Sequence, residues 1–467
     1  MAGMLKFHLN TRRPPAFSST LTKRNVTLTF GGSAEVRQSV LGDWFIKGPI
    51  SLTAISPSPI GTGSTARNGA MINPSDKWTH GYDGRVNLFG GVVYSDALNM
   101  GIGLPRTLNP GDTLICTISR LPELTSDQLY AVDAHRRCMA ECEIFHVVDT
   151  LPPTNAFRPP YCGTSKPIYT TDDVNYALLG LLTPPFDPTS GSFSFAFADA
   201  KQGLIGPYLD HCDKISTDAA GLVPDSWQEW YPAYRGKNYN RVAAYTLCNF
   251  SDRNTMANRL IQIGIDLYGA TGQANWTWRG GAGFAVSRLM PILYAGKLLN
   301  NTAMLTTPGS TADPKFGEQS SWYYTASPYA GYNYPAGSYP NGKPLYGDID
   351  GSTSGYNHTG VDPHHYFNSV GPGSRYTYSD GTCDHMLDAG AYMYLSTPVM
   401  VGASMISRLL GFDSNWNAQA SHDFADWWAS DDQLRLLSSD ATNDYRRDIA
   451  MSGSGNGFML QMWNNNI

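Results

Sequence analysis

The segment Ser251–Gly269, with the sequence SDRNTMANRLIQIGIDLYG, carries the clearest helical period in the chain. Its apolar residues recur at steps of four, three and four and so share one helix face: Met256, Leu260, Ile263 and Leu267. Ser251 is suited to cap the first turn and Gly269 to stop the last one. The segment predicts an amphipathic helix with one buried stripe.

The same theme recurs on the C-terminal side of this segment. Three further stretches favour helices, namely Phe284–Leu299, Asp384–Leu410 and Ala418–Trp428. Pro291 and Pro398 lie inside the first two. Because proline lacks the N–H donor, we expect each to kink its helix or to begin a new one. The second half of the chain is predicted to be a helical array.

Before residue 150 the pattern is that of strands. Short runs rich in β-branched and aromatic residues alternate with turn signals such as Gly31-Gly32 and Asn109–Asp112. The runs are Val26–Phe30, Trp44–Ile46, Ile50–Ile55, Leu88–Tyr94, Thr113–Ile118 and Cys138–Val148. They predict an all-β domain of sandwich type.

These two patterns predict an α+β protein of more than one domain. We expect an N-terminal arm over residues 1–24, a β-sandwich-like domain over 25–152 and a helical domain over 153–467. Residues 306–383 lack an aliphatic period but are rich in tyrosine, glycine and serine. The tyrosines favour an ordered excursion over the helices, which serves either as a functional surface or as structural cover.

The composition narrows the classes of partner. Of the 467 residues only 15% are charged, while 12% are aromatic, and the net charge is -6. A polar, uncharged and aromatic surface suits contact with carbohydrate or tight assembly with other subunits. The chain has no basic footprint for nucleic acid, and it has no apolar window long enough to span a membrane.

The N-terminus and the cysteines bear on the compartment. Met1–Asn10 lacks the apolar core of a secretory signal, so we expect either a signal already removed or export by another route such as lysis. The seven cysteines form no Cys-x-x-Cys pair, which argues against a zinc ribbon and against a disulfide framework. Most of them are expected to be buried free thiols.

Several motifs in a fixed order resemble a known group of proteins. They include Gly42–Ile50, Asn68–Pro74, Phe157–Tyr161, Ile263–Tyr268, Gly280–Gly283, Pro291–Gly296 and Trp416-Asn417. Together they are similar to large, uncharacterised bacterial proteins, typically exported, in which a β-domain precedes a helical region. The resemblance implies that the helical domain is like the α/α toroid of polysaccharide lyases.

The resemblance also bears on catalysis. A histidine is expected in this group at the position of Ala282, and a basic pair where Ser287-Arg288 stands. If that histidine is the acid/base of the group, the resemblance implies that this chain cleaves slowly or not at all.

The lyase reaction itself suggests catalytic candidates. Removing the proton next to a uronate carboxylate requires a base, and the leaving oxygen requires a donor. The candidate catalytic residues are Tyr234, His364, His365 and Tyr366. The alternatives stay open that Tyr234 packs at the start of a helix and that the histidine pair has a structural or interface role.

Aromatic, basic and amide side chains are the candidates for sugar contact. Flat rings stack on sugar faces, and arginine holds acidic substituents. The candidate substrate-binding residues are Arg235, Asn238, Trp276, Trp278, Arg279, Arg288, Trp322 and His385. Buried packing of the tryptophans is the alternative. No metal or cofactor is expected, since Asp348–Ser352 lacks the later acidic ligand of a calcium loop.

Two functions of different class follow. The first is a carbohydrate-active or glycan-binding extracellular protein, a lyase-like or hydrolase-like depolymerase of an acidic polysaccharide, with impaired catalysis. The second is a structural or receptor-binding component of an extracellular assembly such as a phage virion. The expected partners are a polysaccharide or surface glycan, or further copies of the chain in an oligomer, and the expected location is extracellular or on a virion.

Overall fold

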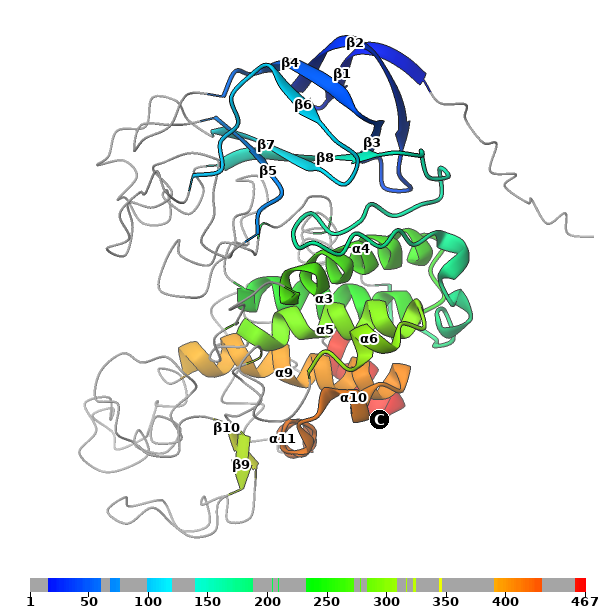
Figure 1. Cartoon of the computed structure of the whole chain (residues 1–467). Helices are drawn as coiled ribbons and strands as arrows, with labels where there is room; N and C mark the ends of the chain where they lie inside the picture. Colours follow the sequence, from blue (N-terminus) through cyan, green and yellow to red (C-terminus); the bar gives the residue numbers. More distant parts are fainter. Residues whose placement is uncertain are drawn as a thin grey trace, which may run out of the picture.

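A computed structural model describes the greater part of both halves of the chain. The described residues are 16–59, 68–75, 99–119, 139–187, 204, 209, 232–272, 278, 284–308, 316, 322–324, 344–346, 390–430 and 458–467. Figure 1 shows a curled β-sheet above a layered set of helices. The fold is α+β, as the sequence predicts.

The N-terminal domain is one eight-stranded sheet. Its strands are β1 (Ala16–Lys23), β2 (Val26–Gln38), β3 (Trp44–Lys47), β4 (Ile50–Ser56), β5 (Gly69–Ile72), β6 (Arg106–Leu108), β7 (Thr113–Ser119) and β8 (Met139–Val148). The order is β5-β7-β8-β3-β2-β4-β6, with β1 pairing β2. The pair β3–β8 is parallel and the other pairs are antiparallel. The sheet is therefore mixed.

The sheet curls because the long strand β2 pairs with two shorter strands along one of its edges. Strands β3 and β4 lie one after the other along the same edge of β2, with Val36 opposite Ile46 and Phe30 opposite Leu52. On its other edge β3 pairs β8, whereas β4 pairs β6. Gly48 lies at the bend between them, where a Cβ would be 2.5 Å from Val147 Cγ1. The result is a half-barrel rather than the two stacked sheets of the expected sandwich.

Strands β7 and β8 are buried on both faces. Leu114, Cys116 and Phe145 belong to the core inside the half-barrel. Ile115 and Ile144, which alternate with them, belong to the core of the helices. Because side chains alternate along a strand, this part of the sheet joins the two domains directly.

The described part of the helical domain contains four long helices and several shorter ones. The helices are α3 (Pro232–Leu247), α4 (Arg253–Thr271), α5 (Phe284–Leu298), α6 (Thr302–Leu305), α9 (Gly390–Leu410), α10 (Asp413–Trp416), α11 (Gln419–Ser430) and α14 (Phe458–Asn466). The strands β9 (Trp322–Tyr324) and β10 (Pro344–Tyr346) form a short hairpin-like pair. Within the described residues, none of the helices combines the length and apolarity that a membrane crossing requires.

Both internal prolines lie within unbroken helices. Pro291 is inside α5 and Pro398 is inside α9, so neither begins a new helix. Gly264 of α4 packs against the Pro291 turn, and a Cβ on it would lie 2.2 Å from Pro291 O and 2.6 Å from Ala295 Cβ. The close approach of α4 to α5 accounts for this glycine.

Helix α4 differs from the expected helix at both ends. Asp252 rather than Ser251 occupies the N-cap, and the helix runs past Gly269 to a C-cap at Gly272. Gly269 is instead a contact point, because a Cβ there would lie 2.3 Å from Pro160 Cβ. The predicted stripe is buried, but so are residues on other faces such as Ile261 and Ile265. Helix α4 therefore packs between the segment that follows β8, which includes Pro160, and helix α5.

In the first half, five of the six predicted strand segments correspond to observed strands, while Cys138 of the last segment and the whole of Leu88–Tyr94 lie outside the described residues. Strand β1 occupies part of the segment expected to be an arm. Its polar sequence, AFSSTLTK, buries only Leu21 and is stabilised mainly by pairing with β2. Among the described cysteines, Cys116, Cys142, Cys162 and Cys248 are free and buried.

Candidate functional site

The first half of α3 carries an unusual set of buried polar residues. The sequence Arg235-Gly-Lys-Asn-Tyr-Asn-Arg241 has every side chain buried. Charged side chains are seldom buried without interaction partners. Gly236 lets α3 approach its neighbours closely, since a Cβ there would lie 2.6 Å from Ser287 Cβ and 2.8 Å from Val399 Cγ1. Gly236 therefore lies where the three helices meet, within this run of buried polar residues.

The helices α3, α5 and α9 run in the same direction. Gly236 meets Ser287, and ten residues later Thr246 Oγ1 lies 2.7 Å from Tyr294 Oη. On the other side, Gly236 meets Val399, and Asn240 packs against Gly402. The first turns of α3 and α5 thus lie at the same end of the domain (Figure 1). The positive ends of the α3 and α5 helix dipoles therefore lie at this end of the domain.

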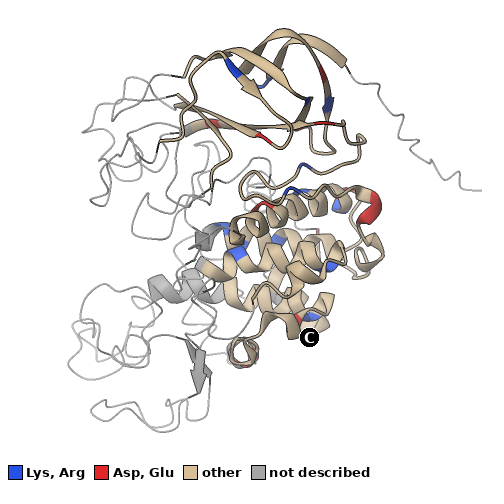
Figure 2. Cartoon of the chain, viewed as in Figure 1, with Lys and Arg blue, Asp and Glu red and all other residues tan. Residues whose placement is uncertain are grey.

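The three helices have an excess of positive charge. Their sequences contain six basic residues and no aspartate or glutamate. The basic residues are Arg235, Lys237, Arg241, Arg288, Lys297 and Arg408. Figure 2 shows the basic segments in blue on these helices. In a chain whose net charge is -6, this is a local concentration of the opposite sign.

Arg288 lies against an aromatic group. Its Cζ is 5.5 Å from the centroid of the Trp278 ring, within cation–π range. The Trp278 ring in turn lies 5.4 Å from the ring of Phe316. Trp278 is only 1% exposed, so its ring packs in the core and holds Arg288 in place.

Amide side chains order the rest of the cluster. Asn240 Nδ2 donates to Val399 O at 2.8 Å, which ties α3 to α9. Arg241 Nη1 donates to Asn238 Oδ1 at 3.2 Å along α3. We call the residues Arg235, Lys237, Asn238, Arg241 and Arg288, which lie near the starts of α3 and α5, the basic cluster. Such a cluster can bind an acidic group through charge-assisted hydrogen bonds.

The predicted site residues divide into three groups. Arg235, Asn238, Trp278 and Arg288 are buried in the helical domain, with Arg288 against Trp278 and Arg235 beside the contact of Gly236 with Ser287. Tyr234 lies in α3 and Trp322 in β9, without described side chains. The others lie outside the described residues: Trp276, Arg279, His364, His365, Tyr366, His385 and also Ala282.

Lys237 belongs to the cluster but was not among the sequence candidates. It lies on α3 between Arg235 and Arg241 and is 3% exposed. The signal that could have found it is the absence of any acidic residue from α3, α5 and α9, which becomes visible only when these helices are known to pack together.

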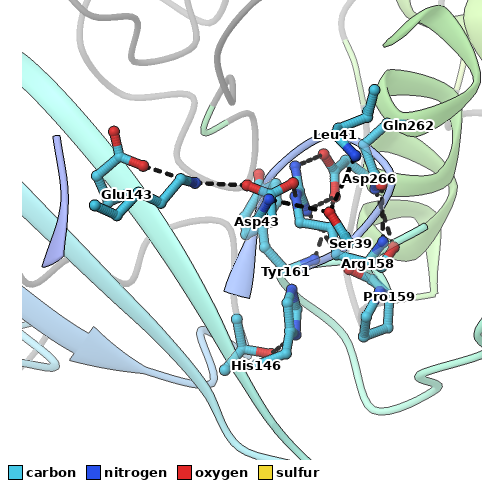
Figure 3. Close-up of polar contacts among 12 residues, drawn as sticks. Ser39, Leu41, Asp43, Glu143, His146, Arg158, Pro159, Tyr161, Gln262 and Asp266 are labelled. Carbon is cyan, nitrogen blue, oxygen red and sulfur yellow. Dashed lines mark hydrogen bonds and ion pairs between the residues drawn. The ribbon is translucent and has the colours of Figure 1, made fainter. Parts of the chain in front are cut away.

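A second polar cluster joins the two domains (Figure 3). Arg158 Nη1 donates to Asp266 Oδ1 of α4 at 2.5 Å, and its Nε lies 3.1 Å from Asp43 Oδ2 before β3. Lys23 Nζ lies 2.6 Å from Asp43 and 2.7 Å from Glu143 of β8. We call this set the junction cluster. It is a continuous chain of alternating charges.

Burial and pairing act against each other in the junction cluster. Burial opposes ionisation of Asp43, but Lys23 and Arg158 outweigh it and lower the pKa of this carboxyl. For Glu143 and Asp266, burial dominates and raises the pKa. All of the charges face partners within the cluster, so its role is to hold the domains together.

One serine–histidine pair resembles a nucleophile and its base. Ser404 Oγ lies 2.7 Å from His422 Nδ1, and His422 Nε2 lies 3.3 Å from the Asp413 carbonyl. Both side chains are buried in the contact of α9 with α11, and no carboxylate among the described residues is hydrogen-bonded to the ring. The pair is structural. Among the described residues, no group of histidine, cysteine and carboxylate side chains could hold a metal ion.

Comparison with family models, with curated proteins and with solved structures found no match for the chain.

Proposed function

We propose that the chain is a carbohydrate-active, extracellular protein that binds an acidic polysaccharide at the end of the helical domain where α3 and α5 begin. The observation that carries this proposal is that four basic residues lie near the starts of α3 and α5, two helices that contain no acidic residue. Uronate or sulfate groups along a polysaccharide are anions that such a cluster attracts.

The geometry gives this attraction a direction. Arg235, Lys237 and Arg241 lie in the first ten residues of α3, and Arg288 lies in the second turn of α5. Since both helices begin at the same end, the side-chain charges and the helix dipoles reinforce one another there. Asn238 adds amide groups, which suit sugar hydroxyls.

The chemistry at this site is proposed to be lyase-like, in an α/α-toroid-like domain whose cover is the Tyr-rich segment 306–383. Arginine groups would hold the uronate carboxylate, while Tyr234 or the His364-His365-Tyr366 cluster would supply the base. The alanine at position 282, where the resembling group is expected to carry histidine, is proposed to impair cleavage more than binding. Losing a positioned proton-transfer group lowers a rate by about 10²–10⁴-fold.

The test is a screen of pectate, alginate and hyaluronate that reads both binding and the appearance of unsaturated ends, with neutral dextran as control. We expect binding to an acidic polysaccharide with slow cleavage, and a faster rate for Ala282→His without a change in affinity. Equal affinity for dextran, or no binding to any acidic polysaccharide, contradicts the proposal.

The alternative function, as a component of an extracellular assembly, has one favourable observation. Phe17 on β1 is 70% exposed, and the described pairing of β1 involves β2 alone. An exposed edge strand with a large apolar side chain is a site for strand addition. A stable oligomer that Phe17→Ser dissociates, in a chain that binds no glycan, would favour this function.

A further inference from the structure

His146 lies where the sheet of the N-terminal domain meets the helices. It is in β8, on the face that carries Cys142 and Ile144 toward the helical core. Its ring lies 6.4 Å from the ring of Phe45, its partner residue on β3. Figure 3 shows it beside the segment that carries Arg158 and Tyr161. The side chain is 2% exposed.

The two ring nitrogens of His146 have different surroundings. Nδ1 lies 3.1 Å from Thr113 Oγ1 of β7. Nε2 is buried, and among the residues that the structure describes it has no hydrogen-bond partner. A neutral ring has one N–H, whereas a protonated ring has an N–H on both nitrogens. Protonation would therefore place a charged donor at Nε2, for which the described part of the chain offers no acceptor, and this is strongly unfavourable.

The charges around the ring act in the same direction. The cations near His146 come from two elements: Arg158 and Lys166 from the segment after β8, and Lys23 from β1. Burial first, and then these cations, hold the pKa of His146 well below its ordinary value.

Neighbouring carboxylates cannot easily compensate a proton on this ring. Asp43 and Asp266 already bind Arg158. Asp112, next to Thr113, accepts hydrogen bonds from Asn73 Nδ2 at 2.6 Å and from the Asn109 backbone at 2.7 Å. A proton on His146 would thus add a positive charge to a junction whose negative charges are already paired.

We propose that His146 makes the junction between the two domains acid-sensitive, so that its protonation releases β8 from the segment Phe157–Tyr161. While β8 packs on the segment Phe157–Tyr161, His146 stays neutral. When the two separate, His146 can be protonated. Opening therefore becomes up to about tenfold more favourable for each pH unit below about 6.5, the value of an unperturbed histidine, and is insensitive to pH above it.

Hydrogen exchange of the full chain, followed by mass spectrometry between about pH 5 and pH 8 and corrected for intrinsic rates, tests this proposal. We expect protection of β8 and of residues 157–161 to fall up to about tenfold per pH unit below about 6.5. His146→Phe, which cannot be protonated, should remove this pH dependence.

His422→Gln is the matched control. His422 is also buried, but both of its nitrogens have partners, and it lies on α11. This variant should keep the pH response at the junction.

A second variant and a second measurement cover the case in which His146→Phe does not fold. His146→Gln retains a polar group for Thr113, and proton NMR of the wild-type histidine rings reports protonation directly. The proposal is overturned if protection stays constant down to about pH 5, if either His146 variant responds to pH as the wild type does, or if His146 titrates near 6.5 with the junction still protected.

Discussion

Arg158 connects carboxylates on the two sides of the domain junction. Its guanidinium binds Asp266 of α4 and Asp43 before β3, and its backbone N–H and C=O both bond to the Gln262 side chain at 3.1 Å. Arg158 is 4% exposed. A buried charge held on two sides depends strongly on each partner, because removing one leaves the other insufficiently compensated.

Asp266→Asn should therefore destabilise the protein strongly. We expect a loss of about 3–5 kcal/mol in the free energy of unfolding, because a buried ion pair is broken from one side. Asp426→Asn is the control, since Asp426 pairs with Arg408 at 2.5 Å but is half exposed, and such a pair contributes about 0–1 kcal/mol. Equal losses in denaturant titrations of the two variants would contradict this role of Arg158.

Residue types could be chosen from the sequence, but residue partners could not. Arg235, Asn238 and Arg288 were selected because they suit an acidic sugar, and the structure buries them in one domain. In the sequence, Arg158 stands out only as part of the motif Phe157–Tyr161. Its partner Asp266 is 108 positions away, and a single sequence contains no signal that pairs them.

Among the elements, α4 and α5 show how a glycine and a proline set a helix contact. Gly264 faces the Pro291 carbonyl, where there is no room for a Cβ. Proline inside α5 therefore lies at the closest approach of the two helices rather than at a break.

Gly264→Ala should separate α4 from α5. A Cβ at 2.2 Å from a backbone oxygen cannot be relieved by rotating a side chain, so we expect a loss of about 1–3 kcal/mol in unfolding free energy. Gly272→Ala is the control at the end of the same helix, where a Cβ would lie at 3.5 Å from Gly269 O. That variant should be neutral or stabilised by about 0.4–1 kcal/mol. If thermal unfolding shows Gly272→Ala to be less stable than Gly264→Ala, the close contact of Gly264 with α5 does not determine stability.

Periodicity predicted the elements better than their ends. The apolar residues that recur at steps of three and four from Met256 to Leu267 predicted α4. Short β-branched runs predicted β2, β3, β4, β7 and β8. Glycines and prolines were interpreted as local stops, whereas Gly269 and Pro291 are explained by contacts with distant segments. Strand β1 was missed because its polar residues lack a buried face, and only β2 defines it.

At the scale of the whole molecule, a half-barrel and a set of helices share one sheet face and one chain of buried charges. Strands β7 and β8 contribute to both cores, and the junction cluster runs from β1 to α4. The helices beyond this junction combine six basic residues with no acidic one, in a chain of net charge -6. We propose that the basic residues near the starts of α3 and α5, Arg288 among them, attract an acidic polysaccharide.

Calorimetric titration of Arg288→Gln and Arg408→Gln with the acidic polysaccharide that the wild type binds best tests this claim most directly. Both arginines lie over a tryptophan ring, at 5.5 Å from Trp278 and 5.6 Å from Trp463, but only Arg288 belongs to the basic cluster. Losing one charge-assisted contact of about 1.5–3 kcal/mol should weaken binding by Arg288→Gln about 10–100-fold. Arg408→Gln should bind as the wild type does, and Arg288→Lys should retain most of the affinity. Equal affinities of the folded Arg288→Gln and Arg408→Gln proteins would contradict the account.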